Sequence, residues 1–299
     1  MIAHGEPKGP RLAGPPGDGK ERALRVLSEL PPFSPILNRV MATLADDNVS
    51  FIELGDLIEK DAVLSGQILQ LANSAMYARR NQVASVRYAL SLLGVAKTRN
   101  IVLGVQVAGM WSKARSPQEL SVSRFNMHSA AVAILSDLLA QYVPSSFGEG
   151  AFVAGLLHDV GRLLMALGLP VEFAEVVRTH RETGVPMVEC EQAALSFTHA
   201  ELSEEVLERW KLPVAVQTAV ARHHSPTPLG QGHPAEIPLS HLVAAADRYV
   251  NSIGMPILEA KPAEPDLESI EGLGLARPRV EQLLADFQRD FEATAQFFR

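Results

Sequence analysis

Apolar residues recur at helical intervals along almost the whole chain, and this spacing limits its fold more than any other feature. In one segment they follow one another mostly at steps of three and four residues: Leu54, Leu57, Ile58, Leu64, Ile68 and Leu71. Such steps place side chains on core-facing stripes of a helix. No run of alternating apolar and polar residues is regular enough to predict a strand. The sequence therefore predicts an all-α fold, a multi-helix bundle.

Breaks in this pattern divide the 299 residues into parts. The length suits two domains of about 100–200 residues each. Glycine and proline are frequent in the first residues and disfavour helix and strand, which predicts a flexible leader. A polar stretch that contains Pro117 is a plausible boundary between two helical lobes. The predicted parts are the leader 1–19, an N-terminal helical lobe 20–118, a second helical lobe 119–253, and a linker with a C-terminal amphipathic helix, 254–299.

Capping and helix-ending residues locate several helices. Asp61 is expected to cap one helix with its carboxylate, and Gly94 to end another that begins at Ser85. Asn73 and Ser74 follow a helical run and are expected to act as caps or turn formers, or to satisfy backbone groups between helices. Further helices are predicted at 97–111, 122–142, 151–167, 170–183, 187–196, 199–210, 213–224, 238–252 and 278–297.

Charge and composition exclude several classes of protein. With 47% hydrophobic and 20% charged residues, the chain is globular and not disordered. Its net charge of −7 disfavours nucleic-acid binding, because no basic excess is available to neutralise phosphates. The single cysteine, Cys190, excludes an internal disulfide framework and CxxC-type sites. The longest apolar stretch, 151–169, is interrupted by His158, Asp159 and Arg162, so no membrane span is expected. These features predict a cytoplasmic protein.

Five predicted helices each carry a histidine or an aspartate on or beside their apolar face. His128, for example, lies four and seven residues before Val132 and Leu135. A single such residue is more often a hydrogen-bonded core residue than a ligand. Buried imidazoles and carboxylates are costly unless they are paired or bind a metal, and convergence at one point would resolve that cost. The residues concerned are His128, His158, Asp159, His199, His223 and Asp247.

This order of residues resembles the ligand set of the HD superfamily of metal-dependent phosphohydrolases. The matching positions are His128, the pair His158-Asp159 within GLLHDVGRLL, and Asp247 within LVAAADRY. The additional histidines His199, His223 and His224 resemble those of the HD-GYP branch, which can hold two or more metals. The chain departs from that branch in two places. No Gly-Tyr-Pro motif follows His224, and Arg162 stands where an HDxGK motif has lysine.

Longer motifs resemble the HDOD family, the HD-related output domain of bacterial signalling proteins. The proline-rich opening LPPFSP starts at Leu30, and the central signature IEKDAVLSGQILQLANSAMY spans 58–77. VRYALSLLGVAKTRNIVL at 86–103 continues the match, as do HAELSEEVLERWKLP and HHSP further on. The resemblance covers about residues 25–250. It implies an N-terminal HDOD-type helical lobe, a C-terminal HD-like helical lobe, and a regulator that acts through contacts with a signalling protein partner.

The resemblance also implies a metal site. On the HD pattern, His128, His158, Asp159 and Asp247 hold a first ion, with Asp159 bridging to a second position completed by His199, His223 and His224. Nitrogen and carboxylate ligands suit iron, manganese or zinc, so we expect one or two such ions. The family as a whole argues for a regulator without efficient catalysis.

The alternative is a metal-dependent phosphohydrolase acting on a nucleotide or a cyclic dinucleotide. In that case Arg162 or Lys97 would meet phosphate oxygens; an exposed or ion-paired role is the other interpretation of each.

The C-terminal helix, with Val280, Leu283 and Phe287 on apolar positions, is expected to pack on the core, with a homodimer contact as the alternative.

Overall fold

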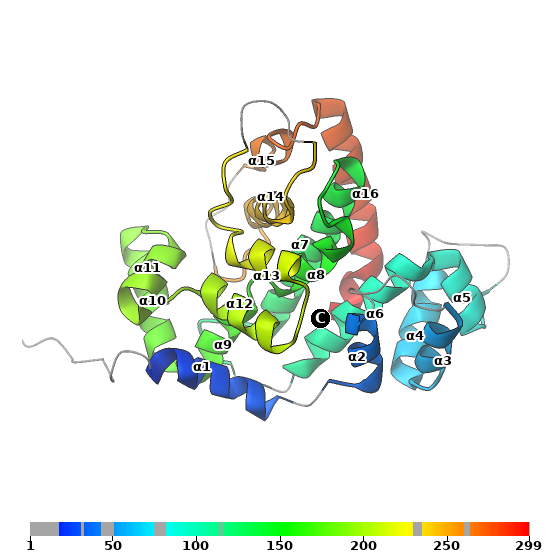
Figure 1. Cartoon of the computed structure of the whole chain (residues 1–299), viewed down its shortest axis with the longest axis horizontal. Helices are drawn as coiled ribbons and strands as arrows, with labels where there is room; N and C mark the ends of the chain where they lie inside the picture. The colour runs from blue at the N-terminus through cyan, green and yellow to red at the C-terminus, as the bar shows by residue number, and fades with distance from the viewer. Residues whose placement is uncertain are drawn as a thin grey trace, which may run out of the picture.

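The computed structural model describes residues 18–30, 33–42, 51–74, 82–112, 114, 116–229, 235–259 and 264–298. Within these ranges the chain is helical, and its only extended pairing is an isolated bridge between Ser145 and Ile237. The predicted all-α class is therefore confirmed. Figure 1 shows two groups of helices joined through the centre of the molecule, with the C-terminal helix beside the junction.

The N-terminal lobe contains five of these helices. They are α2 (Pro35–Ala42), α3 (Phe51–Glu59), α4 (Ala62–Ala72), α5 (Val86–Leu93) and α6 (Val95–Met110). The Asp61 carboxylate caps α4 by accepting hydrogen bonds from the backbone N–H groups of Val63 and Leu64. Gly94 ends α5 at φ +83°, a conformation that favours glycine. Both predicted helix boundaries are confirmed.

Asn73 joins the end of α4 to the segment that precedes α5. Its side-chain amide donates hydrogen bonds to the carbonyls of Leu69 and Val83, each at 2.8 Å. The Val83 N–H donates back to Asn73 Oδ1, also at 2.8 Å. The residue therefore satisfies backbone groups between helices, one of the two structural roles expected of it.

We expect Asn73→Ala to lower the free energy of unfolding by about 2–3 kcal/mol, because it leaves these backbone groups unpaired. Equilibrium urea unfolding measures the change. Gln82→Ala is a matched control, because Gln82 is an exposed neighbour, and we expect an effect below about 0.5 kcal/mol. Equal stability of the two variants would contradict the role given to Asn73.

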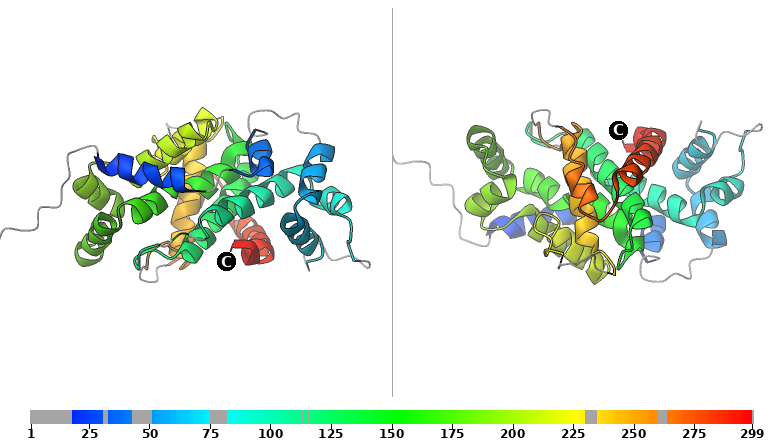
Figure 2. Two further views of the ribbon diagram at one scale, coloured as in Figure 1. Left: turned by 90° about the horizontal axis from the view of Figure 1, so that it is seen from below. Right: turned by 90° about the horizontal axis from the view of Figure 1, so that it is seen from above.

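The second lobe is built around α7 (Val122–Tyr142), which packs extensively on α8 (Ala151–Leu157) and α14 (Leu239–Ser252). A Cβ at Gly155 would lie 2.8 Å from the Ala133 Cα, so glycine allows this close approach of α7 and α8. The remaining helices of the lobe surround this centre. They are α9 (Val160–Gly168), α10 (Pro170–Thr183), α11 (Met187–Leu195), α12 (His199–Arg209) and α13 (Val214–Ala221). Figures 1 and 2 show α10 and α11 at the end of the molecule opposite α3–α5.

The predicted helix 151–167 is wrong in one respect, because the structure divides it. The helical run is interrupted by a turn at His158 and Asp159, between α8 and α9. The segment Gly148–Gly168 is apolar and long enough to pass for a membrane span, but 89% of its most apolar 18-residue window is buried inside the protein. It also carries the His-Asp pair, so it is a core element of the helical lobe.

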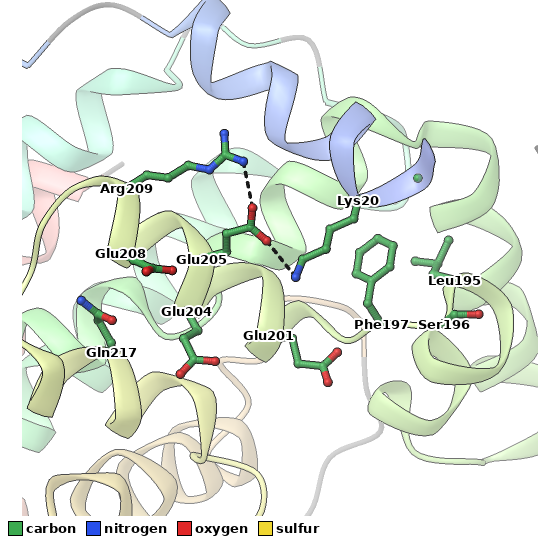
Figure 3. Close-up of a pocket in the computed structure, with 11 residues that line it drawn as sticks. Lys20, Leu195, Ser196, Phe197, Glu201, Glu204, Glu205, Glu208, Arg209 and Gln217 are labelled. Atoms are coloured by element: carbon green, nitrogen blue, oxygen red, sulfur yellow. Dashed lines mark hydrogen bonds and ion pairs between the residues drawn. The ribbon is translucent and has the colours of Figure 1, made fainter. Parts of the chain in front are cut away.

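The first helix, α1 (Asp18–Glu29), starts inside the predicted leader, so Asp18 and Gly19 are helical. The rest of the predicted leader, 1–17, lies outside the described residues. Although α1 precedes the N-terminal lobe in the chain, it packs against α9 and α12 of the second lobe. Lys20 binds Glu205 of α12 at 2.8 Å, and Glu205 also binds Arg209 (Figure 3).

After the short helix α15 (Glu268–Glu271), α16 (Arg277–Thr294) and the 3₁₀ turn η2 (Ala295–Phe298) complete the chain. Val280, Leu283 and Phe287 are buried, and α16 packs on α7. The expected packing of this helix on the core is confirmed. The turn η2 also contacts α6, so the C-terminal segment bridges the two lobes.

Candidate metal centre

The turn at His158 and Asp159 directs both side chains into the space between α7, α12, α13 and α14. His128 comes from α7, His199 from the first turn of α12, and Asp247 from α14; His223 and His224 directly follow α13. The structure therefore brings all seven predicted ligand residues together. Six of them are buried, and His224 is exposed.

One group of donor atoms surrounds His158. Its Nε2 lies 3.3 Å from His128 Nε2, 3.5 Å from Asp159 Oδ2 and 3.6 Å from Asp247 Oδ1. His128 Nε2 is 3.2 Å from the same Asp247 oxygen. Bonds of about 2.1 Å from one ion separate neighbouring donor atoms by about 3.0–3.4 Å, depending on the coordination geometry. These four side chains can therefore converge on one metal ion with little movement.

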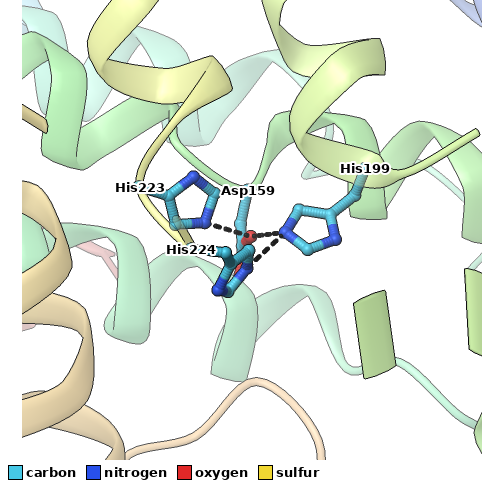
Figure 4. A group of neighbouring side chains, drawn as sticks. All are labelled: Asp159, His199, His223 and His224. Atoms are coloured by element: carbon cyan, nitrogen blue, oxygen red, sulfur yellow. Dashed lines mark hydrogen bonds and ion pairs between the residues drawn. The ribbon is translucent and has the colours of Figure 1, made fainter. Parts of the chain in front are cut away.

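A second group surrounds the other oxygen of Asp159. Asp159 Oδ1 lies 2.9 Å from His199 Nε2 and 3.7 Å from His223 Nε2. His224 Nε2 lies 2.8 Å from His199 Nε2 (Figure 4). The donor atoms of these four residues all lie within 4.8 Å of one another. Asp159 faces both groups with different oxygens, as a bridging ligand would.

The outer nitrogens of the histidines are held in a way that suits metal ligands. Nδ1 of His128 donates to the Met255 carbonyl at 2.8 Å, and Nδ1 of His158 donates to the Gly155 carbonyl at 2.8 Å. Nδ1 of His223 lies 2.6 Å from the Val220 carbonyl. A carbonyl can only accept, so the proton of a neutral ring is on Nδ1 and the Nε2 lone pair faces the centre.

Glu191 is a member of the centre that sequence reasoning missed. This fully buried residue of α11 accepts hydrogen bonds from His199 at Nδ1 (2.6 Å) and at the backbone N–H (2.9 Å). The carboxylate thus orients His199 as a second-sphere partner orients a ligand histidine. A further partner, Asn251, donates to Asp247 Oδ1 at 2.7 Å.

Arg162 is ion-paired and not exposed. Its Nη1 lies 2.7 Å from Asp159 Oδ2 and its Nε 3.7 Å from Glu191 Oε1. Its Nη2 lies 3.2 Å from His199 Nε2, beside the second donor group. Lys97, the other residue considered for phosphate, pairs with Asp290 of α16 and lies outside this centre. The ion-paired interpretation therefore describes both residues.

The three histidines of the second donor group differ widely in pKa because their surroundings differ. Burial and the neighbouring His158 lower the pKa of His223 to about 3. Desolvation and His223 lower the pKa of His224 to about 2, although that residue is exposed as a whole. Both rings are neutral at pH 7 and can offer a lone pair. Burial and Arg162 oppose protonation of His199, but Glu191 and Asp159 outweigh them and raise its pKa to about 9.

The two aspartates remain ionised. Burial opposes their charge, but Arg162 and the histidines hold the pKa of Asp159 well below its ordinary value. Hydrogen bonds from His128 and His158 do the same for Asp247. His223 Nε2 is buried and has no hydrogen-bond partner among the described residues. An unpartnered inward nitrogen beside an ionised carboxylate fits a cation, so the residues present suit a metal ion.

Comparison with known protein families matches residues 30–226 to the HDOD domain. The chain belongs to the HDOD family. A relative from Treponema pallidum (strain Nichols), described only as uncharacterized, is 21% identical over 204 residues, which are 67% of this chain. The matched part is 38% of that relative's length.

Solved structures share the fold. An HDOD domain protein of unknown function from Geobacter sulfurreducens has a TM-score of 0.73 at 23% identity, covering 94% of this chain and 97% of the other. A candidate signal transduction protein from Marinobacter aquaeolei VT8 has a TM-score of 0.71 at 22% identity, and the match covers 94% of this chain and 64% of the other. A candidate phosphohydrolase from Shewanella amazonensis SB2B has a TM-score of 0.71 at 19% identity, and the match covers 93% of this chain and 98% of the other. The helical arrangement of this chain is therefore shared with these three proteins.

Proposed function

We propose that this HDOD protein is a regulatory module of bacterial signal transduction that acts through protein contacts, holds a metal ion at the HD-like centre and has no efficient catalysis. One observation carries the proposal. The donor atoms converge as a metal requires, but the side chains are buried apart from His224, and the Arg162 cation pairs with the shared carboxylate of Asp159. Such an ion would be held structurally and not offered to a substrate.

The N-terminal lobe supports the part of the proposal that concerns protein contacts. It exposes several large apolar side chains to solvent, whereas its described residues contain no clustered imidazoles. The exposed residues are Ile52, Val63, Tyr88 and Val95. A contiguous apolar patch marks a surface that meets another protein, and we propose that these side chains belong to such a patch. We propose that the partner is a signalling protein and that the protein is cytoplasmic. A homodimer is the alternative form of the contact.

Within the centre, His128, His158, Asp159 and Asp247 would hold the ion. Iron, manganese and zinc all suit these ligands. Bound there, the metal would supply a fixed positive charge, and it would occupy the Nε2 positions where the imidazoles could otherwise bind a second proton. The chain's own residues supply the rest: Glu191 orients His199, and Arg162 balances the charge of Asp159.

Elemental analysis of protein purified without added metal or chelator tests the metal site. We expect about one equivalent of a transition metal, and loss of that metal in His158→Ala/Asp159→Ala. The matched control is His180→Ala/Glu182→Ala, a histidine and a carboxylate on α10 outside the centre, which we expect to keep the metal. Absence of metal after purification and after reconstitution with iron, manganese and zinc would overturn the proposal.

The alternative function, hydrolysis of a nucleotide or a cyclic dinucleotide, is favoured by the shared carboxylate between two donor groups. A metal there would supply Lewis-acid activation of water. We expect metal-loaded protein to release no phosphate or opened dinucleotide above the background of the His158→Ala/Asp159→Ala variant. Multiple turnovers that the variant lacks would replace the regulatory proposal with the enzymatic one.

A further inference from the structure

A cavity of about 510 Å³ lies at the junction of the two lobes, outside the His/Asp centre. Its walls come from α6, α7, the start of α8 and the C-terminal segment, α16 with η2. Ile134, Leu138, Phe152 and Phe298 form an apolar surface around it. This volume lies within the range of cavities that bind small organic molecules, about 300–1,000 Å³.

Three buried polar atoms in its lining lack hydrogen-bond partners among the described residues. Two are acceptors, Asn100 Oδ1 and Asp290 Oδ1, and one is a donor, Arg99 Nε. Asn100 is only 5% exposed. A buried polar atom without a partner costs free energy, so pairing is gained when a ligand enters the cavity, displaces the side chains that cover these atoms and supplies the complementary groups.

The remaining contacts of these residues fix their roles. The other oxygen of Asp290, Oδ2, accepts from Lys97 at 2.9 Å. The Asn100 amide hydrogen-bonds the Asp137 carboxyl, which leaves the Asn100 carbonyl oxygen unpaired. Arg99 uses Nη2 to reach the Glu149 carbonyl at 3.4 Å, so its Nε remains for another acceptor. The charged side chains in the lining are Lys97, Arg99, Asp137, Glu149 and Asp290.

A single ligand class complements this combination. Two unpartnered acceptors call for N–H groups, an unpartnered guanidinium nitrogen calls for an acceptor, and the apolar walls call for a hydrocarbon body. Charges of both signs in the lining suit a molecule that also carries both. We propose that this cavity binds a small zwitterion with an apolar side chain, an α-amino acid, with its ammonium toward Asn100 and Asp290 and its carboxylate toward Arg99.

The position gives such binding a consequence for the whole molecule. A ligand in the cavity contacts α6 of the N-terminal lobe, α7 and α8 of the second lobe, and α16 at once. Because it binds this arrangement and not a separated one, it stabilises the docking of the C-terminal segment against both lobes.

Calorimetric titration of the full chain with three matched probes tests the proposal. L-phenylalanine carries both charged groups, 2-phenylethylamine lacks the carboxylate, and 3-phenylpropanoate lacks the ammonium. We expect L-phenylalanine to bind at least about tenfold more tightly than either of the others, because each lost charged hydrogen bond weakens binding by that order. No binding of L-phenylalanine up to its solubility limit, or equal binding of all three, would overturn the proposal.

Two variants assign the groups. Arg99→Met should weaken L-phenylalanine about tenfold and leave 2-phenylethylamine unchanged, because that probe has no carboxylate. Asn100→Leu should weaken both of these probes and leave 3-phenylpropanoate unchanged. Gln288→Ala, an exposed change on α16 outside the cavity, is the control and should bind all three as the unaltered protein does. Equal effects of Arg99→Met on L-phenylalanine and 2-phenylethylamine would contradict the assignment. The His158→Ala/Asp159→Ala variant should bind L-phenylalanine normally, because the cavity does not depend on the metal.

Discussion

Gly161→Ala is expected to lower the free energy of unfolding by at least about 3 kcal/mol, because no space exists for a methyl group at this position. A Cβ there would lie 2.2 Å from the His199 carbonyl oxygen and 2.9 Å from Ser203 N. Both contacts are backbone atoms of α12, which cannot move aside as a side chain could. The Gly161 N–H also donates to Ser203 Oγ at 2.8 Å, and this hydrogen bond would be strained.

The matched control is Gly66→Ala in the exposed part of α4, where a Cβ would meet nothing within 4 Å. That change should stabilise the protein by about 0.5–1 kcal/mol, because alanine favours a helix interior over glycine. Equilibrium urea unfolding of both variants gives the comparison. If Gly161→Ala is no more destabilising than Gly66→Ala, α9 and α12 do not approach as closely as described.

The contact at Gly161 also gives a reason for a glycine so soon after the His-Asp pair, which helical spacing alone does not. Gly161 follows the His-Asp pair by two residues and lets α9 touch the first turn of α12. That contact places His199 beside Asp159, at 2.9 Å. The glycine therefore positions the second donor group although it carries no ligand.

Part of the centre could be predicted because His128, His199 and Asp247 lie on helices with buried apolar residues at helical spacing. His128 shares a helical face with Val132 and Leu135, and burying that face brings the imidazole inside. The apolar run around His158 and Asp159 likewise had to be buried. What periodicity does not give is the interruption between α8 and α9, because the apolar pattern runs through it without a proline or another helix-ending signal.

Glu191 shows where this reasoning ends. It lies on a helix that is weakly apolar, and a carboxylate there is usually exposed. Its burial depends on how α11 is placed beside α12, which local sequence does not encode. The same limit applies to α1, whose apolar face fits α9 of the second lobe and not the neighbouring N-terminal lobe. Long-range pairing of this kind is set by the complete core.

Arg162→Met is expected to raise the number of bound metal ions from about one to about two per chain. The guanidinium lies 3.2 Å from His199 Nε2, a donor atom of the second group, and 2.7 Å from Oδ2 of Asp159, the carboxylate that both groups share. Two unit charges about 4 Å apart repel by about 4 kcal/mol at an effective dielectric constant of 20, and an ion of charge two is repelled more strongly. The arginine thus acts as a built-in cation that opposes an ion between His199, His223 and His224.

Equilibrating each protein with excess manganese or zinc, followed by desalting and elemental analysis, measures the stoichiometry. Arg162→Lys is the matched control, since it keeps the charge and should remain at about one equivalent. Two ions in the unaltered protein, or one in Arg162→Met that is still folded by circular dichroism, would contradict this role. The comparison separates charge from shape, because methionine and lysine side chains are similar in length and differ in the ammonium group. A second ion gained only when the positive charge is removed would identify Arg162 as the group that limits this HDOD protein to a single metal.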